Sequence, residues 1–441
     1  MDFFLPVYYT IESEKEVDDM ALVTVTALGG SGENGRNCYL LCADGRKILL
    51  DCGVSRDSTK ESVGRYPALT RDLACSLDAV FLSHAHEDHC AALPLLYALG
   101  YRGAVHASPE TAQAAPGMIR KWRNYVCACG GVLPYSEEDA ARVAFAPLQT
   151  GENTLAGLRA LTGRSGHTVG SLWITFQIGE NTVFYSGDVC LRSRTLSFDV
   201  PPRCDSAILD YAYAGKTVQQ QAQYDALLSS IRRRTAEGGK VLLPLPASGR
   251  GCDVLLTILT ETDTFPVFAE ASIVRNCESL LQEAAWLREG FEPSVLKSPR
   301  LHSISTEAER QAACKQAGSA FLITDGMLTT PEALTYLNCF RDDPTAHCIL
   351  TGHAAPGTAA GNLRDEAWRR ENGICMTAEM LTVKVHPDDA DEERLLESLG
   401  AKQVVFFHAP RKNCEAVIEK LAERGIDARC LAEGQSVTVS A

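Results

Sequence analysis

The apolar and polar positions in the first half of the chain predict short strands joined by tight turns. Residues 22–30 (LVTVTALGG) and 38–53 (CYLLCADGRKILLDCG) indicate a strand, a glycine loop and a hairpin with an Asp-Gly turn. Residues 171–188 (SLWITFQIGENTVFYSGD) predict another hairpin, which leads to an acid. Residues 79–100 (AVFLSHAHEDHCAALPLLYALG) predict a strand, a loop and a helix, so a histidine-rich loop follows a buried strand.

The pattern changes near residue 212, where longer helices begin to alternate with buried strands. Such alternation predicts an α/β unit with a mostly parallel sheet. Short strands with one or two helices return after about residue 380, and 441 residues are too many for one small core. We therefore predict an acidic N-terminal extension (1–20), a first domain (21–210), an α/β domain inserted into it (211–380) and a return to the first domain (381–441).

The composition, with 45% hydrophobic and 22% charged residues, is that of a soluble globular protein. No stretch reaches the roughly 18–20 consecutive apolar residues that span a bilayer. The N-terminus lacks the basic region of a signal peptide and turns acidic. Seventeen cysteines without an export signal indicate reduced thiols. These features predict a cytoplasmic protein with no membrane partner.

The net charge of −14 argues against a module that holds nucleic acid through a broad basic face. A nuclease is still compatible with this charge. Its contact with nucleic acid would have to be local, in a cleft where metal ions and a few basic side chains outweigh the global field.

Three of the ten histidines lie within six positions, as His84, His86 and His89, together with Asp88. His84 and His86 alternate on an extended segment, so their side chains point the same way. Imidazole and carboxylate ligands suit zinc, with manganese or iron as alternatives. One loop cannot complete two coordination spheres, so we expect further ligands from other strand ends.

Candidates for those ligands stand at three other predicted strand ends. His167 lies in a glycine/serine loop directly before a strand, Asp188 follows the strand VFYSG, and His408 ends the apolar run VVFFH. A single histidine or aspartate at a strand end is more often a structural hydrogen-bonding group. Together with the first motif, these residues predict a metal site.

The sequence resembles the metallo-β-lactamase superfamily, specifically its β-CASP branch, which includes the polyadenylation cleavage endonuclease and ribonuclease J. The resemblance covers nearly the whole chain from about residue 22 and rests on eight segments: 27–53, 82–111, VFYSGD (183–188), AILDYAYAG (207–215), LLPLPASGRGCDVLLTIL (242–259), FLITDGML (321–328), LTGHAAPGT (350–358) and VKVHPDDADEERLLESL (383–399). It implies an α/β fold with a four-layer αββα core, an inserted β-CASP domain, and an active site in the cleft between them.

The resemblance also implies a pair of metal ions, two zinc ions with manganese as the alternative. It implies that His84, His86 and His167 hold one ion, that Asp88, His89 and His408 hold the other, and that Asp188 bridges them. The implied function is metal-dependent hydrolysis of RNA, as an endonuclease, a 5′–3′ exonuclease or both. The implied catalytic set is Asp88, Asp188, Asp210 and His386.

Asp210 and His386 match the first and second β-CASP motifs, and His408 matches the third. Asp210 would orient a ligand histidine, as carboxylates often do. His386 would protonate the departing ribose oxygen, which requires a group that titrates near neutrality. For the substrate, Arg250 at a helix N-terminus and His353 in LTGHAAPGT are the candidate phosphate contacts.

The chain departs from the family pattern in two places. Lys384-Val385 stands where the family often has Ser-Ala, and Asp325 stands where it often has serine. Neither departure removes a metal ligand. Both bear on the path of the substrate, and at Asp325 an acidic charge near a phosphate is unfavourable.

Three alternatives stay open. A DNA nuclease of the Artemis type belongs to the same branch, but those proteins typically have valine at the third β-CASP motif, where this chain has His408. A small-molecule hydrolase would leave the inserted domain unexplained. A catalytically silent scaffold usually loses ligands, which are all present here. The sequence shows no appended RNA-binding domain, so we expect RNA to be held in the cleft, with a homodimer as one way to enlarge the surface.

Overall fold

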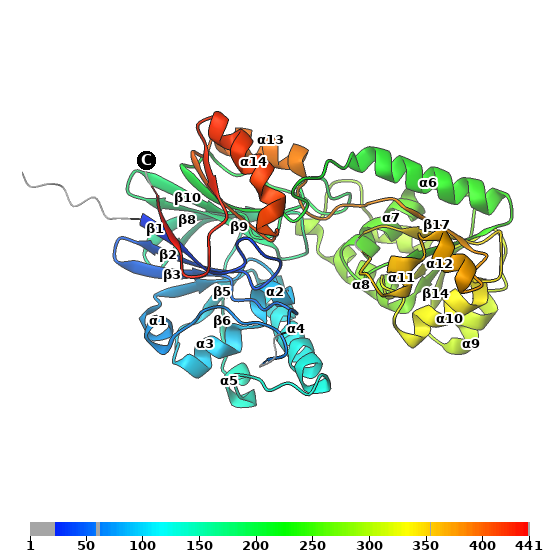
Figure 1. Ribbon diagram of the computed structural model, residues 1–441, viewed down its shortest axis with the longest axis horizontal. Helices are drawn as coiled ribbons and strands as arrows, with labels where there is room; N and C mark the ends of the chain where they lie inside the picture. The colour runs from blue at the N-terminus through cyan, green and yellow to red at the C-terminus, as the bar shows by residue number, and fades with distance from the viewer. Residues whose placement is uncertain (1–22, 59–61, 353, 440–441) are drawn as a thin grey trace, which may run out of the picture.

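The computed structural model describes residues 23–58, 62–352 and 354–439, so the predicted N-terminal extension (1–20) and His353 lie outside the described residues. The chain forms a sandwich of sheets and helices with a second α/β body beside it (Figure 1). Within the described residues, no helix has the length and apolar character needed to cross a membrane.

The first sheet of the sandwich is formed by β1 (Val23–Gly29), β2 (Cys38–Ala43), β3 (Arg46–Leu50), β4 (Ala79–Phe81), β5 (Val105–Ala107), β6 (Phe145–Pro147) and β20 (Ser436–Val439). Its strand order is β20-β1-β2-β3-β4-β5-β6. The predicted first hairpin is confirmed, because β2 and β3 pair antiparallel around Asp44 and Gly45, whose φ angles of 48° and 70° suit the turn. The last strand of the chain, β20, pairs with the first, β1.

The second sheet is formed by β7 (Gly151–Leu155), β8 (Leu158–Arg164), β9 (Leu172–Ile178), β10 (Asn181–Tyr185), β11 (Ser206–Asp210), β18 (Gln403–Phe407) and β19 (Asp427–Arg429). Its order is β19-β18-β11-β10-β9-β8-β7. The predicted second hairpin is β9 and β10. β11 lies between β10 and β18 and is parallel to both, so strands about 200 residues apart in sequence become neighbours.

The two sheets pack face to face, since one apolar cluster contains Leu41 and Ile48 from the first sheet and Ile174 and Phe176 from the second. Helices cover the outer faces. On the first sheet lie α1 (Arg71–Ser76), α2 (Glu87–Cys90), α3 (Leu93–Leu99), α4 (Pro109–Ala128) and α5 (Glu137–Ala141), and on the second lie α13 (Asp389–Leu399) and α14 (Arg411–Glu423). The expected four-layer αββα core is confirmed.

The second body is built on a third sheet of β12 (Lys240–Pro244), β13 (Val267–Glu270), β14 (Leu301–Ile304), β15 (Ser319–Ile323), β16 (His347–Leu350) and β17 (Thr377–Met380), in the order β14-β13-β15-β12-β16-β17. Neighbouring strands are parallel, as predicted, and the central strands are almost fully buried because both faces are covered. Its helices are α6 (Gln220–Ala236), α7 (Arg250–Glu261), α8 (Ala271–Gln282), α9 (Glu307–Ala313), α10 (Pro331–Phe340), α11 (Ala359–Asn362) and α12 (Glu366–Glu371), with 3₁₀ turns η1 (Ala284–Trp286) and η2 (Pro293–Lys297).

The strand directions bring several chain segments to one edge of the sandwich. β3 and β4 are parallel, and so are β10, β11 and β18. Their C-terminal ends therefore meet at the same edge, together with the loop after β8. The predicted site residues follow these ends.

Candidate metal centre

The histidine-rich loop begins where β4 ends and passes directly into α2. The predicted helix begins earlier than the apolar pattern indicated, at Glu87, so Asp88 and His89 lie inside its single turn. His86 is the N-cap residue, with extended φ and ψ of −77° and 155°. The second helix, α3, starts only at Leu93, next to a proline in its first turn. The three rings lie together, with the His84 ring centroid 4.6 Å from that of His86 and 4.1 Å from that of His89.

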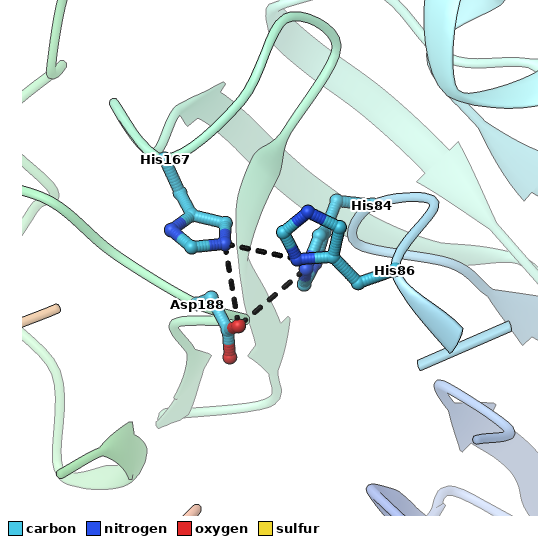
Figure 2. Close-up of side chains that lie close together, drawn as sticks. All are labelled: His84, His86, His167 and Asp188. Carbon is cyan, nitrogen blue, oxygen red and sulfur yellow. Dashed lines mark hydrogen bonds and ion pairs between the residues drawn. The ribbon is translucent and has the colours of Figure 1, made fainter. Parts of the chain in front are cut away.

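The first cluster consists of His84, His86, His167 and Asp188, whose ligand atoms lie within 4.8 Å of one another. Asp188 Oδ2 is 3.5 Å from His84 Nε2 and 3.4 Å from His167 Nε2, and His167 Nε2 is 3.2 Å from His86 Nδ1 (Figure 2). The side chains of His84 and Asp188 are fully buried. These are the residues predicted for one metal ion and its bridge.

The second cluster consists of Asp88, His89 and Asp188. His89 Nε2 is 3.0 Å from Asp188 Oδ1 and 3.6 Å from Asp88 Oδ2. Asn37 lies beside it and donates from Nδ2 to Asp88 Oδ2 over 3.3 Å. Asp188 therefore presents one oxygen to each cluster, as a bridging carboxylate would.

His408 joins the second cluster from the end of β18. Its Nε2 is 3.4 Å from Asp88 Oδ2, and its Nδ1 is 3.5 Å from Asp188 Oδ1. Its φ is 60°, in the left-handed region that costs a residue with a side chain about 1–2 kcal/mol. Strain of this kind at a site is held by surrounding contacts, here including a hydrogen bond from the His408 backbone N–H to the Gly30 carbonyl (3.2 Å).

Asp210 and His386 form a pair next to His408. His386 Nδ1 donates to Asp210 Oδ2 over 2.8 Å, and Asp210 also accepts from the backbone N–H groups of Val189 and Ala212. Asp210 Oδ1 is 3.5 Å from His408 Nδ1. Asp188, Asp210, His386 and His408 are close enough to hold a cation as a third group. The position of His408 therefore suits a cation held with Asp188 and Asp88 and equally one held with Asp188 and Asp210.

The hydrogen bonds fix which ring nitrogens face the clusters. His167 Nδ1 donates to the Val385 carbonyl (3.0 Å), so Nε2 carries the lone pair. The Ser83 hydroxyl donates to Asp51 (2.6 Å), so Nδ1 of His84 donates to Ser83 Oγ (3.1 Å) and leaves His84 Nε2 as the lone-pair nitrogen. Both lone pairs point at Asp188 Oδ2, which is a cation-binding arrangement.

Burial lowers the pKa of His86, His84 and His167, the last to about 3, and the neighbouring imidazoles add to this effect. These rings are therefore neutral, which is the form that binds metals. At His408 burial acts in the same direction, but Asp188, Asp210 and Asp88 raise its pKa to about 9.

At His89 burial again opposes protonation, yet Asp188, Asp88 and Asp51 raise its pKa well above the usual range. At Asp188 burial opposes ionisation, but His89 and His408 hold its pKa well below the usual range. The carboxylates thus attract positive charge into the second cluster.

A divalent cation fits this donor set. His84 Nε2, Asp188 Oδ1 and His408 Nδ1 are buried and make no hydrogen bond among the described residues, although Asp188 Oδ1 lies close to the rings of His89 and His408. Burying polar atoms without a hydrogen bond lowers the stability of the folded protein unless a ligand or an ion takes their place. Lone-pair imidazole nitrogens and ionised carboxylates are the ligands that zinc and manganese take.

Asp51 is a site residue that the sequence analysis missed. It follows β3 with φ 59° and is fully buried. Its carboxylate accepts from His89 Nδ1 (2.6 Å), the Tyr185 hydroxyl (2.5 Å), and the Ser83 backbone N–H (2.7 Å) and hydroxyl (2.6 Å). The signal was present as an acid that ends the buried run KILLD, which is the same signal that singled out Asp188.

The two departures from the family pattern have structural explanations. Lys384 is buried, and its Nζ pairs with Asp388 (2.8 Å) and Asp391 (2.5 Å) at the start of α13. The Asp325 carboxylate accepts backbone N–H groups of its own loop, from Met327 (2.7 Å) to Thr330 (2.9 Å). Both charges are engaged within the protein, and their effect on the substrate path stays a prediction.

The predicted substrate contact Arg250 lies at the start of α7, and its Nη1 donates to the Val383 carbonyl over 3.4 Å. It lines a cavity of about 210 Å³ in the inserted body, together with Asp325 and Gly352. The other predicted contact, His353, lies outside the described residues.

A larger cavity of about 480 Å³, which we call the inter-domain cavity, opens beside the first cluster. His86 and His167 form part of its wall. Side chains of α4 line it from the sandwich, and side chains of α7 and α8 line it from the inserted body. The first cluster is therefore reached between the two bodies.

Comparisons with known proteins agree with this architecture. Residues 31–237 match the family described as "Metallo-beta-lactamase superfamily". The chain is 28% identical over 378 residues to the transcription termination factor FttA of Cenarchaeum symbiosum, which covers 78% of this chain and 58% of that protein. It is 25% identical over 436 residues to the ribonuclease TTHA0252 of Thermus thermophilus (94% and 100% covered) and 23% identical over 447 residues to the endoribonuclease ysh1 of Schizosaccharomyces pombe (95% and 58%).

The chain thus spans little more than half the length of some of these relatives and all of another. Among solved structures, a protein of unknown function from Enterococcus faecalis V583 superposes with a TM-score of 0.61 at 12% identity, over 95% of this chain and all of that one. This likeness concerns the fold alone.

Proposed function

Because the chain belongs to the metallo-β-lactamase superfamily, and within it to the β-CASP branch, we propose that it is a metal-dependent ribonuclease that hydrolyses RNA phosphodiester bonds between its two domains. The observation that carries the proposal is the convergence of the predicted ligands from separate strand ends onto Asp188, beside the inter-domain cavity. Cleavage is endonucleolytic, 5′–3′ exonucleolytic, or both. The inserted domain comprises residues 211–380.

In this proposal the resident metals are two zinc ions, with manganese as the alternative. His84, His86 and His167 would hold one ion, Asp88, His89 and His408 would hold the other, and Asp188 would be shared between them. Bound divalent cations in such a site lower the pKa of water and offset charge on the attacking and leaving oxygens of a phosphodiester.

The chain's own residues position these groups and move the proton. Asp51 accepts from His89 Nδ1 and thereby keeps Nε2 of that ring facing Asp188. The Val385 carbonyl does the same for His167. Asp210 accepts from His386 Nδ1, which leaves His386 Nε2 to hold the proton that the departing ribose oxygen requires.

RNA is favoured over the alternatives by two observations. Two of the relatives are named as ribonucleases, and the third β-CASP position is a histidine, His408, with its ring in the cluster. A silent scaffold would not need the lone-pair nitrogens that point at Asp188. The seventeen cysteines, all in the described part of the chain, are free thiols, which suits a cytoplasmic enzyme. A homodimer stays a prediction.

The test is hydrolysis of matched labelled single-stranded RNA and DNA, each with a 5′-monophosphate or a 5′-triphosphate, with zinc or manganese added. Wild type is compared with Asp188→Ala and His386→Ala. We expect RNA cleavage that is lost in Asp188→Ala and slowed about 10²- to 10⁴-fold in His386→Ala, the range for a general acid. The product ladder separates endonuclease from exonuclease.

Equal cleavage of DNA would favour the DNA nuclease. Cleavage of neither polymer by a protein that carries two metal ions would contradict the proposal and point to a small-molecule substrate or a scaffold.

A further inference from the structure

The wall of the inter-domain cavity has an unusual chemistry for a site beside a phosphodiester. Carboxylates, primary amides and hydroxyls line it, and no lysine or arginine is among its described lining residues. The charged and amide members are Glu110, Gln113, Asp253, Asn276, Gln282 and Glu283. This wall repels the negatively charged sugar-phosphate backbone of RNA, because it offers no basic side chain to offset that charge.

A neutral group rich in hydrogen-bond donors fits the same wall. Carboxylate oxygens only accept hydrogen bonds, whereas each amide both donates and accepts. Asp253 is already engaged, by the hydroxyls of Thr195 and Ser193. Glu110 is not, because its Oε2 is buried without a hydrogen-bond partner among the described residues. Glu110 therefore lines the cavity with an acceptor oxygen that no described residue uses.

The position of the cavity indicates which part of the substrate enters it. His86 and His167 belong both to the cavity wall and to the first cluster. A nucleotide whose phosphate lies at the cluster therefore has its base within reach of the cavity. A volume of about 480 Å³ lies within the roughly 300–1,000 Å³ of small-molecule sites.

We infer that the inter-domain cavity binds the nucleobase next to the cleaved phosphate and selects guanine, an inference that rests on the proposed ribonuclease function. Guanine presents two neighbouring donors, N1–H and N2–H₂, which match the two oxygens of one carboxylate. It also presents the acceptor O6. Glu110 accepts from the two donors, and Gln113, one turn later on the same face of α4, donates to O6. Adenine, cytosine and uracil each lack this pair of adjacent donors.

The experiment uses uridine-rich single-stranded RNA with one guanosine at a fixed position, and matched RNAs with inosine or adenosine there. Cut positions and rates are mapped for wild type and Glu110→Gln. Glu138→Gln is the matched control, because it also removes a carboxylate from the first turn of a helix, the exposed α5. Thermal melts verify that each variant is folded.

We expect wild type to cut fastest next to guanosine. Inosine lacks N2–H₂ and should be cut about tenfold more slowly, since it keeps only one of the two hydrogen bonds to the carboxylate. Glu110→Gln should bring the ratio of the cleavage rates at guanosine and adenosine to about one, and Glu138→Gln should keep the wild-type ratio. RNA cleavage at equal rates for all bases would overturn the guanine pocket but not the ribonuclease. A preference that Glu110→Gln leaves intact would also overturn it. No RNA cleavage would overturn both.

Discussion

The carboxylate of Asp51 offers the sharpest test of how the metal centre is held, because it touches no reacting atom in the proposed mechanism. It accepts four hydrogen bonds of 2.5–2.7 Å, from His89, Tyr185 and Ser83. Asp51→Asn keeps the size and shape of the side chain. Asparagine also tolerates the φ of 59° found here, so the variant adds no backbone strain.

The expected loss follows from counting acceptors. A carboxylate offers four lone-pair positions on two oxygens, whereas the asparagine carbonyl offers two. Oδ1 accepts only from the Ser83 backbone N–H, whereas Oδ2 accepts from the Ser83 hydroxyl, His89 and Tyr185. The NH₂ group therefore faces one donor if it replaces Oδ1 and three if it replaces Oδ2, and each buried donor without a partner costs about 1–3 kcal/mol. The less costly orientation leaves one donor unpaired, so the free energy of unfolding should fall by at least about 1–3 kcal/mol. If the NH₂ group faces His89 Nδ1, the ring proton moves to Nε2 and faces the site. Outer partners of this kind typically account for about 10- to 100-fold in metal affinity.

The assay is competition for zinc with a chromophoric chelator, alongside thermal unfolding of the metal-free protein. Asp205→Asn is the control, because Asp205 also accepts two short hydrogen bonds, from the backbone N–H and hydroxyl of Thr182, at the opposite end of β11 from Asp210. It should change zinc affinity little. Unchanged zinc affinity in folded Asp51→Asn, or an equal loss in both variants, would refute the reasoning.

Three further predictions concern metal content and stability. Asp188→Ala should lower the zinc content from two ions per chain to fewer than one by elemental analysis, because both clusters share this carboxylate; two retained ions would contradict the shared role. Lys384→Met should lower the free energy of unfolding by about 3–5 kcal/mol in thermal melts, because it leaves the buried carboxylates of Asp388 and Asp391 without their ammonium partner; an unchanged melt would argue against this ion triad. Burial, reinforced by neighbouring carboxylates, raises the pKa of Glu392 well above its usual range, and both its side-chain oxygens lack hydrogen-bond partners among the described residues. The folded chain thus keeps a proton that the unfolded chain releases above about pH 4.3. Glu392→Met should therefore raise the free energy of unfolding by an amount that grows from about pH 5 to pH 8. A stability difference between the variant and wild type that does not change with pH would contradict this reasoning.

The candidate site shows where sequence reasoning succeeded. A histidine-rich loop after a buried strand, and single polar residues at the ends of apolar runs, identified residues that lie together in the structure, such as His84, His167 and Asp188. The reason is that parallel strands end at a common edge of their sheet. Asp51 obeys the same rule, but a single acid at a strand end is more often a structural hydrogen-bonding group, so this signal alone did not identify it.

The charges at Lys384 and Asp325 show where it could not succeed. In the sequence each is a charged residue at a position where the family often has serine. In the structure each is engaged by its own surroundings, Lys384 by the carboxylates at the start of α13 and Asp325 by loop N–H groups. Which nearby group a charged side chain pairs with depends on how the backbone turns. The residue pattern alone therefore shows neither the ion pairs of Lys384 nor the hydrogen bonds of Asp325.

The sequence by itself determined the strands, the inserted parallel unit and the types of ligand, because periodicity and residue chemistry are local properties. Only the tertiary structure decided which ring nitrogen of each histidine faces the metal centre, since that depends on acceptors such as Asp51 and the Val385 carbonyl, which are remote in the chain. It also decided the wall chemistry of the inter-domain cavity, because Glu110 and Asn276 become neighbours of the same space only when α4 and α8 pack across the two bodies.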